Sequence, residues 1–208
     1  MFGILVLGDS ISFGRGESPN IGWAGRLKSH FEPKGFHNCL YNLGVPGDTS
    51  TMLLQRFEKE IRARVKYIHV GDKFLIMIAI GINDSLGWGS PDKVMTSPKR
   101  FRTNINKMLK ISKKHTENVI LVGLTPVNED LTTPFEVAYL TNARIKEYDN
   151  IIKESATKGD ALFIDLHSKM TKLPYKKLLA DGLHPNKKGY EAMYRIIKEF
   201  LVKNKLIA

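Results

Sequence analysis

Several features that mark other protein classes are scarce in this sequence. Cys39 is its one cysteine, so the chain cannot form an internal disulfide. No apolar run approaches the roughly 20 residues that cross a bilayer. The first residues lack the charged segment and the small-residue cleavage site of a secretory leader. These absences predict a protein of a reducing compartment such as the cytoplasm, without a membrane span.

Several motifs that carry chemistry are also missing. The chain has no Gly-x-x-x-x-Gly-Lys phosphate loop, no Gly-x-Gly-x-x-Gly dinucleotide loop and no His-Glu-x-x-His zinc helix. A paired-cysteine zinc knuckle and the Gly-x-Ser-x-Gly elbow of α/β-hydrolases are absent as well. The sequence therefore predicts no cofactor and no metal.

The apolar pattern alternates between two kinds of segment. Short apolar runs rich in branched residues predict strands at 2–7, 38–42, 74–80, 118–123 and 161–164. Apolar residues at helical spacing predict helices at 21–31, 49–68, 101–111, 137–152 and 186–201. The length of 208 residues and the hydrophobic fraction of 42% suit one domain, 1–208. Strands that alternate with helices predict a doubly wound α/β fold, with a five-stranded parallel sheet and helices on both faces.

Polar turns follow three of the predicted strands. Ser10 comes directly after the first strand, Gly44 after the second and Asn83 after the third. The carboxyl ends of parallel strands share one edge, and ligands of open α/β sheets bind there. We therefore expect these three residues to lie close together, although a turn that uses Ser10 only for local hydrogen bonds is the simpler alternative.

A base for Ser10 is available near the other end of the chain. Serine is a weak nucleophile and needs a base within hydrogen-bond reach, which a third group orients. Asp181 and His184 are three residues apart in a turn before the last helix, so the carboxylate can contact one imidazole nitrogen and leave the other for Ser10. The backbone amides of Ser10 and Gly44 and the side-chain amide of Asn83 are candidate donors to an oxyanion.

These residues lie in four motifs that resemble those of the SGNH hydrolases, also called GDSL esterases and lipases. The motifs are Gly8-Asp9-Ser10, Asn42-Leu-Gly44, Gly81-Ile-Asn83-Asp84 and Asp181-Gly-Leu-His184-Pro185. Each is weak alone, but here all four occur in the family's order and span the chain from end to end. One departure is Ile11, which stands where the family has the leucine of its older name.

The resemblance implies the SGNH hydrolase fold, with a flavodoxin-like sheet. It also implies metal-free hydrolysis of carboxylic esters through an acyl-serine. Ser10 would be the nucleophile, His184 the base, Asp181 its orienting acid, and Ser10, Gly44 and Asn83 the oxyanion hole. The partner is then a small-molecule ester. The modest chain length leaves little for a lipid-covering lid and favours short acyl or acetyl groups, while lysophospholipase and thioesterase activities fit the same motifs.

Two parts of the site have alternatives in the sequence. Asp165 and His167 close the fifth predicted strand, and side chains two apart in an extended chain share a face, so they could form a second dyad. His184 is preferred because its turn matches the family motif. Trp88, Pro126 and Tyr139 are expected to border the site and are candidates for a substrate pocket, although loop aromatics can equally cover core.

Two other function classes remain in view. Asp9, Asn83, Asp84, Asp181 and His184 could supply ligands to a metal-dependent phosphoesterase, but such sites usually use several histidines. A polyanion-binding α/β module would use only the net charge of +11. That charge is spread evenly, because residues 1–104 carry 14 Lys and Arg against 9 Asp and Glu, and residues 105–208 carry 18 against 12. The even spread predicts a solvated basic surface and no nucleic-acid partner.

Overall fold

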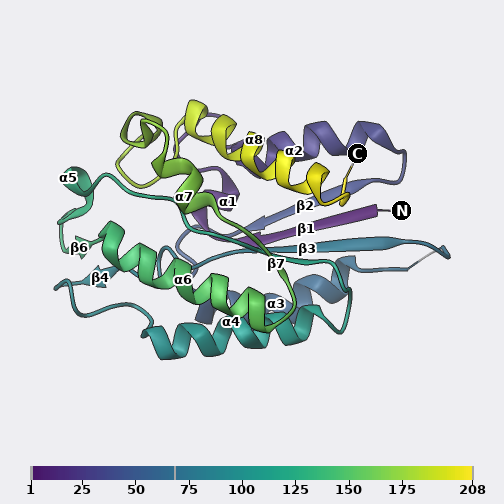
Figure 1. Ribbon diagram of the computed structural model, residues 1–208, viewed down its shortest axis with the longest axis horizontal. Helices are drawn as coiled ribbons and strands as arrows, with labels where there is room; N and C mark the ends of the chain where they lie inside the picture. Colours follow the sequence, from purple (N-terminus) through teal and green to yellow (C-terminus); the bar gives the residue numbers. More distant parts are fainter. Residues whose placement is uncertain (1, 68, 208) are drawn as a thin grey trace.

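A computed structural model describes residues 2–67 and 69–207. Five parallel strands form its central sheet (Figure 1). In spatial order they are β2 (Cys39–Gly44), β1 (Phe2–Gly8), β3 (Lys73–Ala79), β5 (Val119–Val122) and β7 (Leu162–Ile164). The chain leaves β1 towards one edge and then returns past it towards the other, so the predicted doubly wound, flavodoxin-like fold is confirmed.

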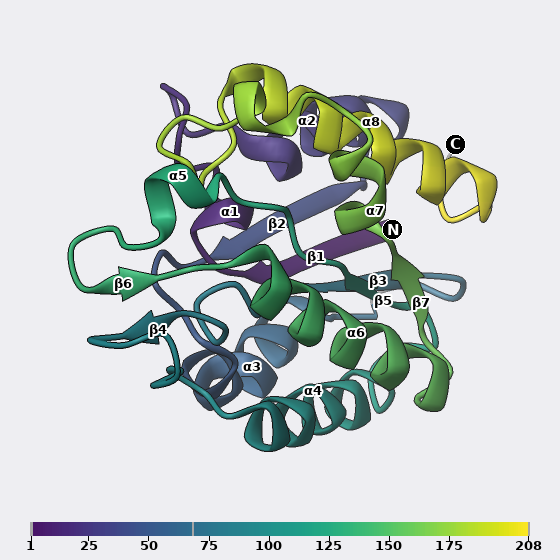
Figure 2. The same cartoon turned by 60° about the vertical axis from the view of Figure 1, so that its left-hand side comes forward.

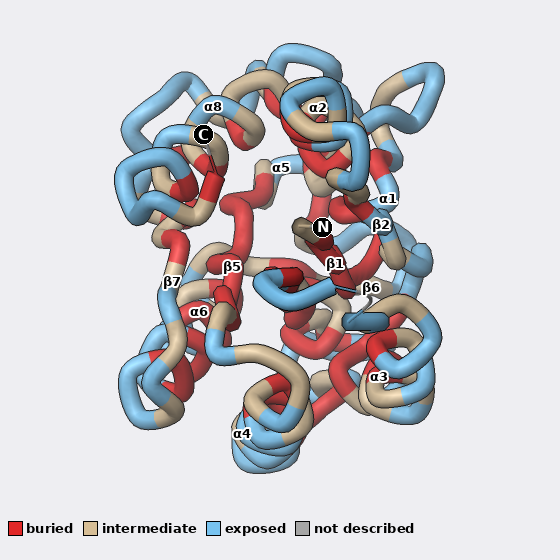
Figure 3. Tube along the Cα trace, turned by 90° about the vertical axis from the view of Figure 1, so that its right-hand side faces the viewer, coloured by how far each residue is buried: buried red, intermediate tan, exposed pale blue. Residues whose placement is uncertain are grey.

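The two central strands owe their position to their apolar sequences. Along the ladder, Leu5 of β1 lies opposite Tyr41 of β2 on one side and Ile76 of β3 on the other. Leu5 and Ile76 are fully buried, and Figure 3 shows β1 as a buried segment inside a more exposed outer shell. Burial of one such side chain contributes roughly 1.5–3 kcal/mol, which makes the β1–β3 pair the centre of the core.

Helices cover both faces of the sheet, and the two groups separate clearly in Figures 1 and 2. Beside β1 lies the single-turn helix α1 (Ser10–Phe13). One face carries α2 (Gly22–Phe31), α7 (Leu166–Thr171) and α8 (Lys187–Lys203), and the other carries α3 (Ser50–Arg64), α4 (Pro98–Ser112) and α6 (Asn142–Lys158). In α8, the residues that face the sheet at helical spacing are buried: Tyr190, Met193, Ile197 and Leu201.

Two predicted helices have different ends. Helix α3 ends at Arg64, and Val65 already has an extended backbone, so the predicted continuation is wrong there; Ile68 lies outside the described residues. Helix α6 begins at Asn142, where the side chain of Thr141 caps it, and Val137 is 47% exposed in the preceding loop. In both places the apolar spacing continues past the helix boundary, which the Thr141 cap sets for α6 and the extended backbone of Val65 sets for α3.

Several short elements were not predicted. Within the loops after β3 and β5, β4 (Gly87–Trp88) pairs antiparallel with β6 (Ala138–Tyr139). The loop after β5 also holds α5 (Glu129–Thr132), and 3-10 turns cover Glu32–Lys34 and Tyr175–Leu178. Such elements are too short for a periodic signal in the sequence. No helix in the described residues is long and apolar enough to cross a membrane.

Candidate active site

Ser10 lies at the carboxyl end of β1, in the first turn of α1. Gly8 allows this tight turn, because a Cβ at Gly8 would lie 2.4 Å from the carbonyl oxygen of Ala79. Asp9 caps α1: its Oδ1 accepts a hydrogen bond of 2.9 Å from the backbone N–H of Ile11. The turn holds the Ser10 hydroxyl at the edge of the sheet, where 5% of the residue is exposed.

The turn that precedes α8 orients His184. Asp181 Oδ1 accepts hydrogen bonds from the backbone N–H groups of Leu183 (3.0 Å) and His184 (2.7 Å). The other oxygen, Oδ2, lies 2.7 Å from His184 Nδ1. Gly182 has a φ of +89°, a left-handed conformation that favours glycine. One carboxylate therefore both closes the turn and binds the imidazole ring.

The two turns meet although they lie at opposite ends of the sequence. Ser10 Oγ is 3.0 Å from His184 Nε2. When the Nδ1 proton faces Asp181, Nε2 is left to accept the proton of the serine hydroxyl. Partial burial alone would raise the pKa of Asp181, but hydrogen bonds from the His184 ring and from two backbone N–H groups outweigh it and hold the pKa well below its usual range. Asp181 is thus ionised at every pH at which a neutral His184 could accept a proton.

The three candidate oxyanion donors differ in the hydrogen bonds that they already make. The backbone N–H of Ser10 is in the first turn of α1 and has no acceptor within that helix. The Asn83 amide donates one hydrogen to the Asp48 carbonyl at 2.9 Å, and an amide carries two. The backbone N–H of Gly44 donates to Asn42 Oδ1 at 3.1 Å. An oxyanion at Gly44 would therefore have to replace the Asn42 side chain.

Asp84 connects the Asn83 turn to α3 by hydrogen bonds with Ser50. It is fully buried, and its two oxygens accept hydrogen bonds from the Ser50 hydroxyl (2.6 Å) and the Ser50 backbone N–H (2.8 Å). Asn104 of α4 donates to the same hydroxyl at 2.9 Å. The sequence analysis missed Asn104, although an asparagine within the apolar face of a helix is a signal of such a contact.

Arg56 of α3 is a second residue that the sequence analysis missed. Its Nε and Nη2 donate to Asp48 Oδ2 at 3.0 and 2.8 Å. Nη2 also donates to the carbonyls of Leu43 (2.9 Å) and Gly8 (3.3 Å). Because the Asp48 carbonyl in turn accepts from Asn83, this guanidinium links the turns that carry all three candidate oxyanion donors.

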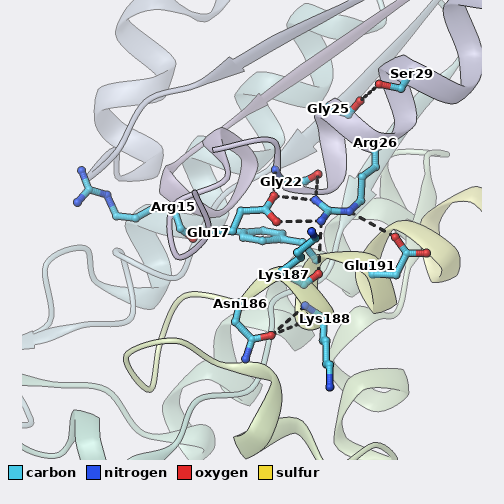
Figure 4. Close-up of polar contacts among 12 residues, drawn as sticks. Arg15, Glu17, Gly22, Gly25, Arg26, Ser29, Asn186, Lys187, Lys188 and Glu191 are labelled. Atoms are coloured by element: carbon cyan, nitrogen blue, oxygen red, sulfur yellow. Dashed lines mark hydrogen bonds and ion pairs between the residues drawn. The ribbon is translucent and has the colours of Figure 1, made fainter. Parts of the chain in front are cut away.

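A second polar network binds the loop after α1 to the start of α8 (Figure 4). Glu17 accepts two hydrogen bonds from Arg26 of α2, at 2.7 and 2.8 Å. Arg26 Nε also lies 3.4 Å from Glu191 Oε2 in α8. Nearby, the Tyr190 hydroxyl donates to the Arg15 carbonyl at 2.6 Å. These contacts hold the segment after Ser10 against the helix that follows His184.

The alternative dyad of Asp165 and His167 is not formed. Strand β7 ends at Ile164, and Asp165 instead caps α7, where its Oδ1 accepts from the Ser168 backbone N–H at 2.9 Å. His167 lies within α7, is 9% exposed and has no partner at Nε2 among the described residues. Burial lowers its pKa. The expectation of an extended Asp165–His167 segment was wrong because a helix begins at this point.

The three candidate pocket residues are not gathered into one element. Trp88 and Tyr139 lie on the β4 and β6 strands that pair with each other, and Trp88 is 52% exposed. Pro126 follows β5 and is buried. Their contact with a substrate stays a prediction.

The carboxylates considered as metal ligands have other partners. Asp9 caps α1, Asp84 binds Ser50 and Asp181 binds His184. Across residues 2–67 and 69–207, no group of three or more His, Cys, Asp or Glu side chains is placed to hold a metal ion.

The doubly wound sheet, with hydrogen-bonded serine, histidine and aspartate at its carboxyl edge, defines an enzyme of the ester-hydrolase class. The comparison with family models makes the assignment specific. The chain belongs to the GDSL-like lipase/acylhydrolase family, whose model matches residues 6–192. The resemblance seen in the four motifs is therefore confirmed.

Individual relatives agree with this assignment. The chain is 25% identical over 201 residues to an arylesterase from Vibrio mimicus, a match that covers 97% of this chain and 88% of that protein. A crystal structure of a lipase/acylhydrolase from Enterococcus faecalis superposes with a TM-score of 0.77 at 25% identity, over 97% of this chain and 95% of that one. A variant of an acetyl xylan esterase from Geobacillus stearothermophilus shares the fold, with a TM-score of 0.70 at 21% identity over 95% and 93% of the two chains.

Replacement of Arg56 tests whether its contacts align the site. We expect Arg56→Met to lower kcat at least about tenfold with a smaller change in KM. A buried acceptor that loses its donor costs about 1–3 kcal/mol, and without the guanidinium the turns shift relative to one another. Arg56→Lys should lose less. Steady-state hydrolysis of an aryl ester measures both constants, and Lys59→Met, an exposed position on the same helix, is the control. Equal activity of the Arg56→Met and Lys59→Met variants would contradict the alignment role.

Asp9 offers a test through stability. Burial raises the pKa of Asp9 to about 7, and the Ile11 hydrogen bond offsets this only in part. The folded chain therefore keeps a proton that the unfolded chain loses near pH 4, and this contribution to stability disappears as the pH rises through 7. When the pH is raised from 5 to 8, the unfolding free energy of wild type should therefore fall by about 3 kcal/mol more than that of Asp9→Asn, whose side chain does not titrate.

Urea unfolding at the two pH values measures this gain. Asp92→Asn, at a carboxylate that is 97% exposed, is the matched control and should follow wild type. The idea fails if Asp9→Asn and Asp92→Asn show the same dependence on pH.

Proposed function

We propose that this chain hydrolyses carboxylic esters through an acyl-serine intermediate, with Ser10 as nucleophile, His184 as base and Asp181 as its orienting acid. The observation that supports this most strongly is the continuous contact from Ser10 Oγ through the His184 ring to Asp181 Oδ2, with distances of 3.0 and 2.7 Å. The reaction would take place on a small-molecule ester in a reducing compartment such as the cytoplasm, without a nucleic-acid partner.

In the first half-reaction, His184 Nε2 takes the hydroxyl proton while Ser10 Oγ attacks the ester carbonyl. The carbonyl π electrons move onto oxygen, and Asp181 stabilises the imidazolium that forms. Collapse of the tetrahedral intermediate breaks the bond to the alcohol, and the imidazolium gives its proton to the departing oxygen. The acyl group then remains on Ser10.

In the second half-reaction, His184 removes a proton from water, and the resulting hydroxide attacks the acyl-serine. Both tetrahedral intermediates carry an oxyanion, which we assign to the backbone N–H of Ser10, the second hydrogen of the Asn83 amide and the N–H of Gly44. The first two are available as they stand, whereas Gly44 exchanges Asn42 Oδ1 for the oxyanion. Collapse returns the proton from His184 to Ser10 and releases the acid.

We assign short acyl or acetyl esters as the preferred substrates. The arylesterase from Vibrio mimicus and the acetyl xylan esterase from Geobacillus stearothermophilus are relatives whose names fit such substrates. One observation favours longer acyl chains, as in a lysophospholipase or thioesterase. Apolar side chains close to the site in the fold are exposed, at 36% for Phe13 after the nucleophile and 52% for Leu131, whose Cβ approaches Gly182.

Removal of the Ser10 hydroxyl is the direct test. Ser10→Ala should lower kcat for a short-chain aryl ester by about a thousandfold or more without lowering the unfolding temperature, because no other described hydroxyl contacts His184. Ser12→Ala removes a neighbouring hydroxyl that has no hydrogen-bond partner and serves as control. Hydrolysis by Ser10→Ala at the wild-type rate would refute the nucleophile.

Two histidine variants test the base. His184→Ala should lose as much activity as Ser10→Ala, whereas His167→Ala should keep the activity of wild type.

A serine-directed phosphonate should label Ser10 in wild type. A metal-dependent phosphoesterase would instead lose activity to a chelator and recover with added metal, and a polyanion-binding module would respond to neither reagent.

A series of aryl esters decides the acyl preference. We expect kcat/KM to be highest for acetyl to butyryl esters and to fall for octanoyl and longer chains. Acetylated sugars assayed in parallel identify the alcohol side. A maximum at octanoyl or above would favour the lysophospholipase or thioesterase activity instead.

A further inference from the structure

A groove lies on the surface between α3 and α4. These two helices belong to the helical layer opposite α8 (Figures 1 and 2). Its volume is about 670 Å³. Five of its lining residues are exposed cations: Lys59 and Arg62 on α3, Lys107 and Lys110 on α4, and Lys114 two residues after the end of α4. Glu58 is the one acidic residue among those that line it. The groove is therefore strongly basic.

The cations of this groove are not compensated by the protein. In the described part of the chain, none of the five side chains forms an ion pair or a hydrogen bond, whereas neighbouring bases do: Arg56 binds Asp48 and Lys113 lies near Glu117. The sequence from 93 to 116 contains no Asp or Glu at all. Five uncompensated cations along one groove repel one another, and a bound polyanion would remove that repulsion.

We infer that the groove between α3 and α4 binds a linear acidic polysaccharide, carboxylated or sulfated. The two rows of cations suit negative groups on either side of an extended chain. Gln55 of α3 also lines the groove and can exchange hydrogen bonds with sugar hydroxyls. Leu54 and Ile111 form a half-buried apolar part of the lining, against which the apolar faces of sugar rings can pack.

Two other polyanions fit less well. Proteins that bind single-stranded nucleic acid combine a basic groove with aromatic side chains on which bases stack, and the residues that line this groove include no aromatic side chain. A membrane surface needs apolar anchors that project from a flat face. Here Leu54 and Ile111 are partly buried inside a concave surface.

The groove is separate from the catalytic edge of the sheet. Helices α3 and α4 both begin at that edge, where Ser50 binds Asp84 and Asn104 reaches Ser50. Arg62 lies near the far end of α3, and Lys114 lies two residues beyond the far end of α4. A polymer in the groove would therefore leave Ser10 accessible, and loss of binding should not change hydrolysis of a small ester.

Fluorescence anisotropy with labelled oligosaccharides tests the inference. The probes are a sulfated heparin fragment and a carboxylated polygalacturonate fragment, titrated between about 50 and 200 mM NaCl. Lys107→Glu with Lys110→Glu should weaken binding at least about tenfold and reduce the slope of log K against log salt by about two. Hydrolysis of an aryl ester should stay at the wild-type rate.

The matched control is Lys203→Glu with Lys205→Glu, which changes the net charge equally at exposed positions at the end of α8. It should weaken binding less than about twofold. A second variant, Lys107→Gln with Lys110→Gln, should also weaken binding and covers the case in which the Glu variant fails to fold.

Three results would overturn the inference. Wild type could bind neither oligosaccharide at the lower salt concentration. The control could lose as much affinity as the groove variant, which would mean that overall charge alone attracts the polymer. Oligothymidylate or anionic phospholipid vesicles could bind more tightly than both oligosaccharides, which would assign the groove to nucleic acid or membrane. Preference for one of the two fragments would identify the acidic group.

Discussion

The hydrogen bond between Ser10 Oγ and His184 Nε2 joins turns that are 174 residues apart. Neither turn can place its side chain alone, because each is only a few residues long. The position of Ser10 depends on β1, which is buried between β2 and β3, and that of His184 depends on the packing of α8 over the same sheet. Burial of apolar strands thus provides the rigid support, and the contacts of Glu17, Arg26 and Glu191 bind the two halves of the site together.

Three aspartates near the site show how position decides the role of one side-chain type. Asp9 is buried with a single backbone donor, so its pKa rises to about 7 and it serves as a helix cap. Asp84 is fully buried and its pKa is also raised by burial, yet two contacts from Ser50 make it a tether. Asp181 is more exposed and accepts three hydrogen bonds, so it stays ionised and orients His184. Solvent exposure and donor number separate these roles.

The arrangement of the surface charge, unlike the residues of the site, could not be seen in the sequence. Along the sequence the basic excess is even, and that evenness hides its arrangement in space. Acidic residues pair with bases near the active site and at several helix surfaces, while α3 and α4 bring their uncompensated lysines and arginine to one groove. A polymer held there would leave the catalytic edge open, since that edge lies at the other end of the same helices.

The α/β class, the order of the main elements and the residues of the four polar turns could all be predicted from the sequence. These features depend on local patterns: apolar runs of strand length, helical spacing, and glycine beside a functional side chain. The ends of α3 and α6, the β4–β6 pairing, the rejection of His167 and the role of Arg56 emerged only from the folded structure. At α6 and α7 the helix start depends on a local cap, Thr141 or Asp165, that the apolar spacing does not reveal. The β4–β6 pairing and the Arg56 contacts join residues far apart in the chain, and no local pattern encodes which distant carbonyl a guanidinium will reach.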